Sequence, residues 1–209
     1  VLGDAVNACK NPPKVWINAA SATIYPHSLS QPMTEDFTEF DNDFSVDVCK
    51  KWEASFNRFQ VPGVRKILLR IAIVLGKEYG AFIPLKMLTR LGLGGRQGTG
   101  NQMFSWLHEK DMAGIVDFCL QNENISGVYN VSAPDPVTNR KLMKTLRQQV
   151  KTVIGLPMPK WLLEIGAFII GTETELILKS RYVIPERLLD AGYQFRYDTI
   201  EKAVSELCE

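Results

Sequence analysis

Residues 64–75 constrain the fold more than any other part of the chain. They are mostly apolar, rich in β-branched side chains and closed by Gly76. The second half of the segment does not alternate between polar and apolar residues, which is typical of a central strand in a parallel sheet with helices over both faces. Arg70 lies in the middle of this segment and needs a partner if the strand is buried.

Further strands and helices alternate along the first part of the chain. Apolar, β-branched runs predict the strands, and apolar residues at helical spacing, such as Val48, Trp52 and Phe56, predict the helices. We expect Asp111 and Thr138 to cap the helices that they begin. The predicted strands are 14–20, 64–75 and 127–131, and the predicted helices are 4–10, 44–59, 82–91, 111–120 and 138–151. This alternation predicts an α/β fold with a parallel sheet.

A stretch with two prolines, 156–159, marks a change of pattern. The residues after it predict short helices and no strand; the helices are 161–170, 173–178, 185–191 and 199–207. We therefore predict two domains, an α/β domain at 1–155 and a small, mostly helical C-terminal domain at 156–209.

Composition and charge exclude several functions. The chain has 24 Lys and Arg against 23 Asp and Glu, a net charge of +1, so we expect no nucleic-acid partner. The four cysteines are scattered and only two histidines accompany them, which predicts no metal site and no disulfide framework. Reduced cysteines favour a cytoplasmic location. The apolar runs 67–75 and 161–170 are short and each carries a charge, so we expect no membrane span, and no signal peptide opens the chain.

Four motifs follow one another in an order that is specific when they are taken together. They are Ser21-Ala22-Thr23-Ile24-Tyr25, the strand and turn 69–76, Gly98-Thr99-Gly100 with Trp106-Leu107-His108 and Asp111, and Tyr129-Asn130-Val131 with Pro136-Val137-Thr138. Together they resemble the motifs of the extended short-chain dehydrogenases/reductases, the class that includes sugar-nucleotide epimerases and dehydratases.

One subgroup is especially similar. Its members are often labelled nucleoside-diphosphate-sugar epimerases, and they end in a small C-terminal domain of unknown function. The matching segments here are 48–53, 91–95, 102–108 and 183–197. The resemblance covers essentially the whole chain. It implies that 1–155 is the C-terminal part of a Rossmann-like domain, with a parallel sheet that lacks its N-terminal strands.

The resemblance also implies a site at the strand ends. In this class the serine corresponding to Ser21 hydrogen-bonds the reacting carbonyl or alcohol; the alternative is that Ser21 only caps a turn. The implied cofactor of the full-length protein is NADP or NAD. The nicotinamide end would then contact the backbone of Ala19, Ala20, Ile71, Ala72 and Ile73.

The same resemblance suggests where a substrate would bind. The residues implied as walls of the substrate pocket are Gln102, Phe104, Trp106 and His108. The alternative for Gln102, Phe104 and Trp106 is packing beneath the C-terminal domain, and the alternatives for His108 are a catalytic base and a structural hydrogen-bonding group. We expect Ser21 and the backbone after Arg70 to face one cleft, with Trp106 or His108 on its far wall.

The sequence departs from this family in its cofactor-binding half. No glycine-rich turn follows a first strand, so the usual phosphate-binding helix N-terminus has no counterpart here. We expect that this chain alone binds little or no NADP. We also expect apolar surface at Val15, Ile17 and 67–74, covered by an N-terminal segment or by a second copy in a homo-oligomer.

The catalytic pattern departs as well. The Tyr-x-x-x-Lys positions hold Ser45 and Cys49, and neither side chain can replace the pair in the same way. Phe104 stands where sugar-nucleotide epimerases place an arginine on the diphosphate, which favours a smaller or more apolar ligand. Tyr25 is the tyrosine nearest Ser21 in sequence, and we expect its ring to pack against the loop rather than act as the acid/base.

Three functions are compatible with these features. The first is an NAD(P)-dependent epimerase/dehydratase-like oxidoreductase with an atypical acid/base, acting on an unknown small molecule. The second is a non-catalytic module that senses nucleotides or binds proteins on the same fold. The third is a hydrolase that uses Cys49 and His108.

Overall fold

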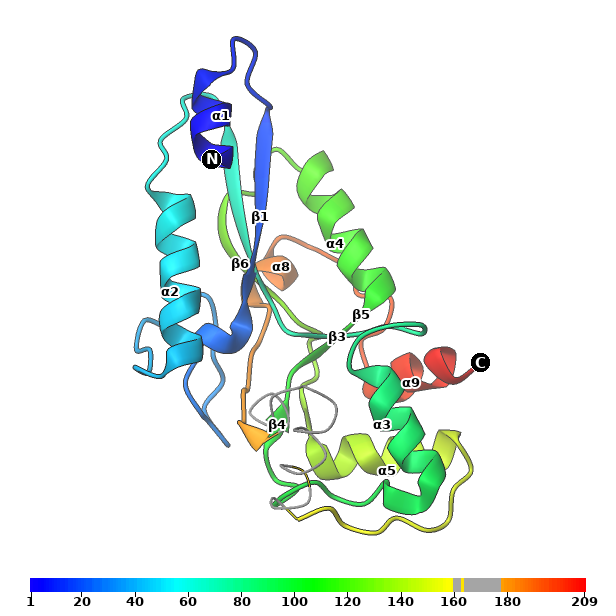
Figure 1. The fold of residues 1–209 in the computed structure, drawn as a ribbon. Helices are drawn as coiled ribbons and strands as arrows, with labels where there is room; N and C mark the ends of the chain where they lie inside the picture. The colour runs from blue at the N-terminus through cyan, green and yellow to red at the C-terminus, as the bar shows by residue number, and fades with distance from the viewer. Residues whose placement is uncertain (160–162, 164–177) are drawn as a thin grey trace.

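The computed structural model describes residues 1–159, 163 and 178–209. Strands β1 (Val15–Ser21), β2 (Arg65–Ile71) and β6 (Gly127–Val131) form a parallel sheet in the order β1-β2-β6. All three strands were predicted from the sequence, and the Rossmann-like parallel sheet is confirmed. Figure 1 shows this sheet with helices on both sides.

Both faces of the sheet are covered, which explains the apolar run in β2. Leu68 packs against Phe56 of α2 (Phe44–Asn57), on the face where Ala20 also lies. Ile67 and Leu69 point to the other face, where they pack with α4 (Glu109–Gln121) and α8 (Glu186–Asp190). The predicted exposure of apolar side chains along 67–74 is therefore wrong for Ile67 to Leu69, which are fully buried, because β2 is central. Val15 and Ile17 of β1 are half-buried.

The segment predicted as one strand, 64–75, is two strands that change partners at Ala72. The N–H of Ala72 donates to the carbonyl of Val131, and the N–H of Ile73 donates to the carbonyl of Ser105. β3 (Ile73–Leu75) then pairs in parallel with β5 (Trp106–His108), away from the main sheet. A separate two-stranded antiparallel pair is formed by β4 (Met103–Phe104), which directly precedes β5, and β7 (Val137–Thr138), which follows β6.

A second apolar core lies against β3 and β5, which contribute Leu75 and Trp106 to it. It contains side chains from α3 (Phe82–Leu88), α5 (Asn139–Gln149) and α9 (Ile200–Cys208). The chain continues from α3 into a π-helical turn, Thr89–Leu93, where Gly92 has a φ of 80° that other residues rarely adopt. The remaining short elements are α1 (Leu2–Ala8) and the 3-10 helix η1 (Ala22–Ile24).

Two predicted helix caps have different outcomes. Thr138 caps α5 as expected, because its side chain accepts the N–H of Lys141. Asp111 does not cap α4: the helix begins two residues earlier, and the ring of His108 accepts the N–H of Lys110 as the cap. The carboxylate of Asp111 instead accepts the backbone N–H groups of Arg196 and Tyr197, which anchors the C-terminal segment.

The C-terminal residues share cores with the α/β part. Val183 packs beside Tyr25 and Cys49, Leu188 packs on the sheet, and Ile200 and Val204 pack beside Trp106. The boundary between 155 and 156 stays a prediction, as do the helices 161–170 and 173–178, which lie almost wholly outside the described residues. Within those described, no helix is long and apolar enough to cross a membrane, and all four cysteines are free thiols.

Candidate functional site

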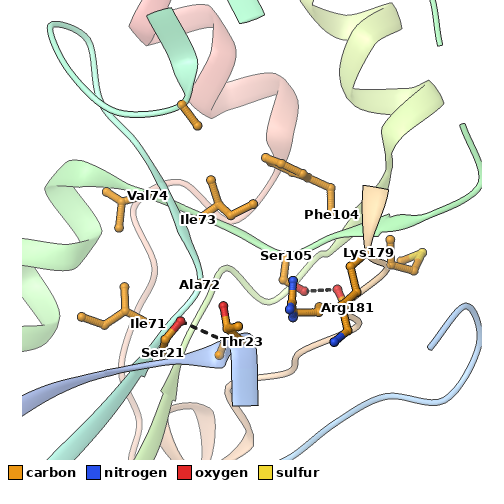
Figure 2. Close-up of a pocket in the computed structure, with 13 residues that line it drawn as sticks. Ser21, Thr23, Ile71, Ala72, Ile73, Val74, Phe104, Ser105, Lys179 and Arg181 are labelled. Atoms are coloured by element: carbon orange, nitrogen blue, oxygen red, sulfur yellow. Dashed lines mark hydrogen bonds between the residues drawn. The ribbon is translucent and has the colours of Figure 1, made fainter. Parts of the chain in front are cut away.

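A pocket of about 300 Å³ opens at the carboxyl ends of β1 and β2. This is the end of a doubly wound sheet at which ligands bind. Figure 2 shows the side chains around it. The lining residues are Ser21, Ala22, Thr23, Ile71, Ala72, Ile73, Val74, Ala81, Met103, Phe104, Ser105, Lys179 and Arg181.

Ser21 is the last residue of β1, and its side chain has two roles in the structure. Its hydroxyl oxygen accepts the N–H of Thr23 at 3.1 Å and so caps η1. The same residue also lines the pocket. The two alternatives considered for Ser21, a turn cap and a site residue, are thus compatible in space.

Cys49 approaches Ser21 from α2. Burial is the largest effect on the Cys49 thiol and raises its pKa above the ordinary value of 9.0, which the nearby Ser21 offsets only in part. The thiol is therefore protonated near neutral pH, and its nucleophilic form is disfavoured. Neither Cys49 nor His108 is among the residues that line the pocket. The hydrolase hypothesis needs the two together, and this arrangement does not provide them.

Three of the five residues expected at the nicotinamide end lie in the pocket. Ile71, Ala72 and Ile73 line it where the chain passes from β2 to β3. Ala20 instead packs beneath α2 with Phe56 and Leu68, and Ala19 borders a separate surface cavity. Ser21 is therefore the residue of β1 that lines this pocket.

Of the four residues expected at the substrate, Phe104 alone lines the pocket. Trp106 is fully buried in the second core, because its pairing with Ile73 turns it inward, and its indole N–H donates to the carbonyl of Asp135. His108 is also fully buried; its ring stacks on Tyr197 and contacts Glu206 at 2.9 Å. The expected far wall of Trp106 or His108 is replaced by Phe104 and Ser105.

Gln102 lies beside a different cavity. Its side-chain amide donates to the carbonyl of Gln97 at 2.9 Å, and its oxygen accepts from the hydroxyl of Thr99 at 3.2 Å. With Arg96 it borders a cavity of about 600 Å³ next to Pro157. The structure therefore brings Ser21, Ile71, Ala72, Ile73 and Phe104 together at one pocket that Gln102, Trp106 and His108 do not line. The contact expected between the cofactor and the backbone of Ala19 and Ala20 stays a prediction.

Sequence reasoning missed two cations in this pocket, Lys179 and Arg181. The Lys179 ammonium pairs with the Asp43 carboxylate, which lowers the pKa of Asp43, and it lies 3.9 Å from Asp41. Arg181 is 9% exposed. The backbone carbonyl of Arg181 accepts the hydroxyl of Ser105 at 2.7 Å (Figure 2).

A buried polar cluster joins β2, α2 and η1. The guanidinium of Arg70 binds both carboxylate oxygens of Glu53, at 2.8 and 2.9 Å, and donates to the hydroxyl of Tyr25. The Tyr25 hydroxyl also contacts Asn130 at 2.8 Å. Glu53 thus satisfies the need of Arg70 for a partner, whereas the neighbouring Trp52, one of the helix-spaced apolar residues of α2, is 55% exposed.

Tyr25 has no access to the pocket. It is completely buried, and burial raises the pKa of its hydroxyl above the ordinary value of 10.0 despite the nearby Arg70. A residue that is buried and hard to ionise is a poor general acid/base at neutral pH. No group of three or more potential metal-ligating side chains occurs in the part of the chain that the structure describes.

Comparisons with known proteins agree with this architecture. Residues 158–207 match a domain of unknown function, DUF1731. The chain is 32% identical to the human epimerase family protein SDR39U1 over 210 residues, covering 99% of this chain and 70% of that protein. It is 34% identical to the epimerase family protein YfhF of Bacillus subtilis over 199 residues, covering 95% of this chain and 64% of YfhF.

Solved structures give the same result. The crystal structure of human SDR39U1 with NADPH superposes with a TM-score of 0.90 at 31% identity, covering 99% of this chain and 69% of that one. The nucleoside-diphosphate sugar epimerase from Corynebacterium glutamicum has a TM-score of 0.80 at 27% identity, and this chain covers 40% of it. The chain therefore belongs to the epimerase family of extended short-chain dehydrogenases/reductases that carry a C-terminal DUF1731 domain.

Proposed function

We propose that the whole protein is an NADP(H)-dependent, epimerase-like oxidoreductase that acts on a small molecule in the pocket at Ser21. The observation that carries this proposal is the position of the pocket at the carboxyl ends of β1 and β2, beside a serine hydroxyl. The NADPH in the human relative supports the choice of cofactor.

The described residues fit one end of such a cofactor. The strand interruption at Ala72 lies at this pocket, and we assign the nicotinamide ring to the space beside Ile71 and Ile73. The described residues before β1 contain no strand followed by a glycine-rich turn and a helix N-terminus, the elements that usually bind the pyrophosphate in this fold. When bound, the nicotinamide would supply or accept the hydride.

Ser21 is suited to bind the reacting oxygen of a substrate. The N–H of Thr23 occupies one lone pair of the Ser21 oxygen, which leaves the hydroxyl hydrogen able to donate to a carbonyl. Apolar walls at Ile73 and Phe104 exclude water and so strengthen that hydrogen bond. The role that we assign to Ser21 is to polarise and orient this oxygen.

The acid/base chemistry differs from the usual pair. Cys49 occupies the position of the usual lysine, and its buried thiol carries no positive charge that could lower the pKa of a neighbour. This observation favours a second candidate, a module that binds the dinucleotide without turnover. The two candidates agree on NADPH binding and differ in redox turnover.

The experiment uses the full-length protein in two steps. NADPH binding is measured first by cofactor fluorescence, and oxidation of NADPH is then followed with a panel of small aldehydes and ketones. Under the first candidate, Ser21→Ala lowers kcat by about a hundredfold or more, the usual cost of losing a hydrogen-bond donor to a developing oxyanion. NADPH affinity changes little.

Ser205→Ala in α9 is the matched control and should leave both properties unchanged. If the protein binds NADPH but oxidises it with none of the aldehydes and ketones in the panel, the result would favour the sensing module. Absence of NADPH binding by the full-length protein would contradict both candidates.

A further inference from the structure

We infer that the small molecule taken by this pocket carries an anionic group, a carboxylate or a phosphate, and that Arg181 and Lys179 bind it. The inference rests on the proposed function only in treating the pocket as a substrate site. It is drawn from the charge, burial and anchoring of the pocket walls.

The lining of the pocket is positively charged. Its residues include two cations, Lys179 and Arg181, and no carboxylate. The remaining walls are apolar side chains and three hydroxyl-bearing ones, those of Ser21, Thr23 and Ser105. A concave site lined by two cations and by no acidic side chain favours an anion over a neutral or cationic ligand.

Arg181 is held firmly at the pocket wall. The backbone N–H of Arg181 donates to the carbonyl of Met103 at 3.2 Å, and the backbone carbonyl of Arg181 accepts a hydrogen bond from the hydroxyl of Ser105 at 2.7 Å. These two bonds fix the backbone on both sides of its side chain. The guanidinium field reaches Cys49 and Asp43 and acts to lower both of their pKa values, so the charge lies near Ser21. A buried guanidinium offers a planar pair of donors that matches a carboxylate or a phosphate.

Lys179 supplies a second positive charge, which its ion pair with Asp43 partly offsets. Its ammonium pairs with Asp43 and lies 3.9 Å from Asp41. Both carboxylates are substantially exposed, so solvent screens them, while the Lys179 side chain is largely buried. An ammonium has three N–H donors, and its pairing with Asp43 is compatible with a further bond to a ligand.

The remaining walls and the volume of the pocket limit the size and polarity of the rest of the ligand. Met103 and Phe104 are apolar lining residues outside the segment from Ile71 to Ile73 that we assign to the nicotinamide, and the whole pocket, about 300 Å³, is at the small end for ligand sites. Figure 2 shows the cations on the opposite side of the pocket from Ile71 and Val74. The matching chemistry is a small apolar molecule with one anionic end.

The test is a charge series on one scaffold. Phenylacetate, phenyl phosphate, neutral phenylacetamide and cationic phenethylamine are titrated into the full-length protein, with and without NADPH, and their dissociation constants are measured by ligand-observed NMR. We expect at least one anion to bind about tenfold tighter than the amide, and the amine to bind weakest. The ranking of the two anions separates a carboxylate site from a phosphate site.

Variants then locate the effect. Arg181→Gln and Lys179→Gln should each reduce the preference for the anion, Arg181→Gln by about tenfold, while Arg181→Lys keeps part of it. Lys202→Gln is the matched control, because Lys202 is an exposed lysine that also pairs with an aspartate, Asp198. It should leave the preference unchanged.

The outcomes separate this inference from the proposed function. Equal binding of the amide and both anions, or a preference that survives in Arg181→Gln and Lys179→Gln, would overturn the inference. An anion preference that depends on Arg181 supports it even if the protein shows no NADPH turnover. If Arg181→Gln does not fold, Lys179→Gln and the charge series on the unmodified protein still decide.

Discussion

The buried pair Arg70–Glu53 gives a strong prediction for stability. The pair makes two hydrogen bonds, at 2.8 and 2.9 Å, and its side chains are 7% and 10% exposed. Burial alone would lower the pKa of Arg70, but the bonds to Glu53 and Tyr25 raise it above its ordinary value, so the guanidinium stays charged. Glu53→Gln would leave this charge without a counter-ion, at a cost of about 3–5 kcal/mol in the free energy of unfolding.

Urea denaturation of the full-length protein, followed by far-UV circular dichroism, measures this cost. The matched control is Glu123→Gln, at an exposed residue just after α4, which should change the free energy of unfolding by less than about 0.5 kcal/mol. A double variant, Glu53→Met with Arg70→Met, removes both charges at once. It should be much more stable than Glu53→Gln alone, because no buried charge remains.

The reasoning would be refuted if Glu53→Gln lost no more stability than Glu123→Gln. That result would mean that water or another anion reaches Arg70. It would also be refuted if the double variant were less stable than Glu53→Gln, since the cost would then lie in the lost attraction rather than in the unpaired charge.

Three further predictions concern the buried tyrosine, the pH dependence and the isolated chain. Tyr25→Phe removes a hydroxyl shared by Arg70 and Asn130, so unfolding by urea should show a loss of about 1–3 kcal/mol, while kcat falls by far less than the hundredfold typical of a general acid/base. Burial lowers the pKa of His108 below its ordinary 6.5 by more than the nearby Glu206 raises it. As the pH falls, the histidine is therefore protonated in the unfolded chain at a higher pH than in the folded protein. Stability should then decrease from about pH 7 to pH 5, and less steeply in His108→Asn; an unchanged slope would contradict this. Calorimetric titration of NADPH into the 209-residue chain should show binding weaker than micromolar, or less than about 8 kcal/mol, and tighter binding would show that the cofactor site has been misplaced.

The main sheet was predictable because its signals are local. The run of apolar residues in β2 reports burial on both faces, and the helix-spaced residues of α2 report one packed face. The interruption at Ala72 has no such signal. It depends on hydrogen bonds to Val131 and Ser105, which lie far away along the chain.

The site was predictable only where it follows a strand end. Ser21 and Ile71 to Ile73 were identified from motifs that resemble those of the extended short-chain dehydrogenases/reductases, and they lie at the carboxyl ends of parallel strands, where ligands bind in this fold. Lys179 and Arg181 were missed because the return of the C-terminal segment places them there, and the bond between Ser105 and Arg181 spans 76 residues. Two basic residues just before the Val183 motif are the local signal that could have drawn attention to them.

The inward placement of Trp106 could not be read from its neighbours. β4 and β5 are two and three residues long, too short to show a period, so the sequence does not say which side chains face the pocket. The register of Trp106 on Ile73 decides it. Phe104 and Trp106 therefore face different surroundings although both are aromatic.

The most direct test of the account is a crystal structure of the full-length protein with NADPH. We expect the nicotinamide ring to lie in the pocket between Ser21 and the segment from Ile71 to Ile73, within contact distance of the Ser21 hydroxyl. It further predicts that the pyrophosphate is held outside residues 1–209. A nicotinamide ring bound instead in the cavity beside Arg96 and Gln102, or a pyrophosphate held by this chain, would contradict the central claim.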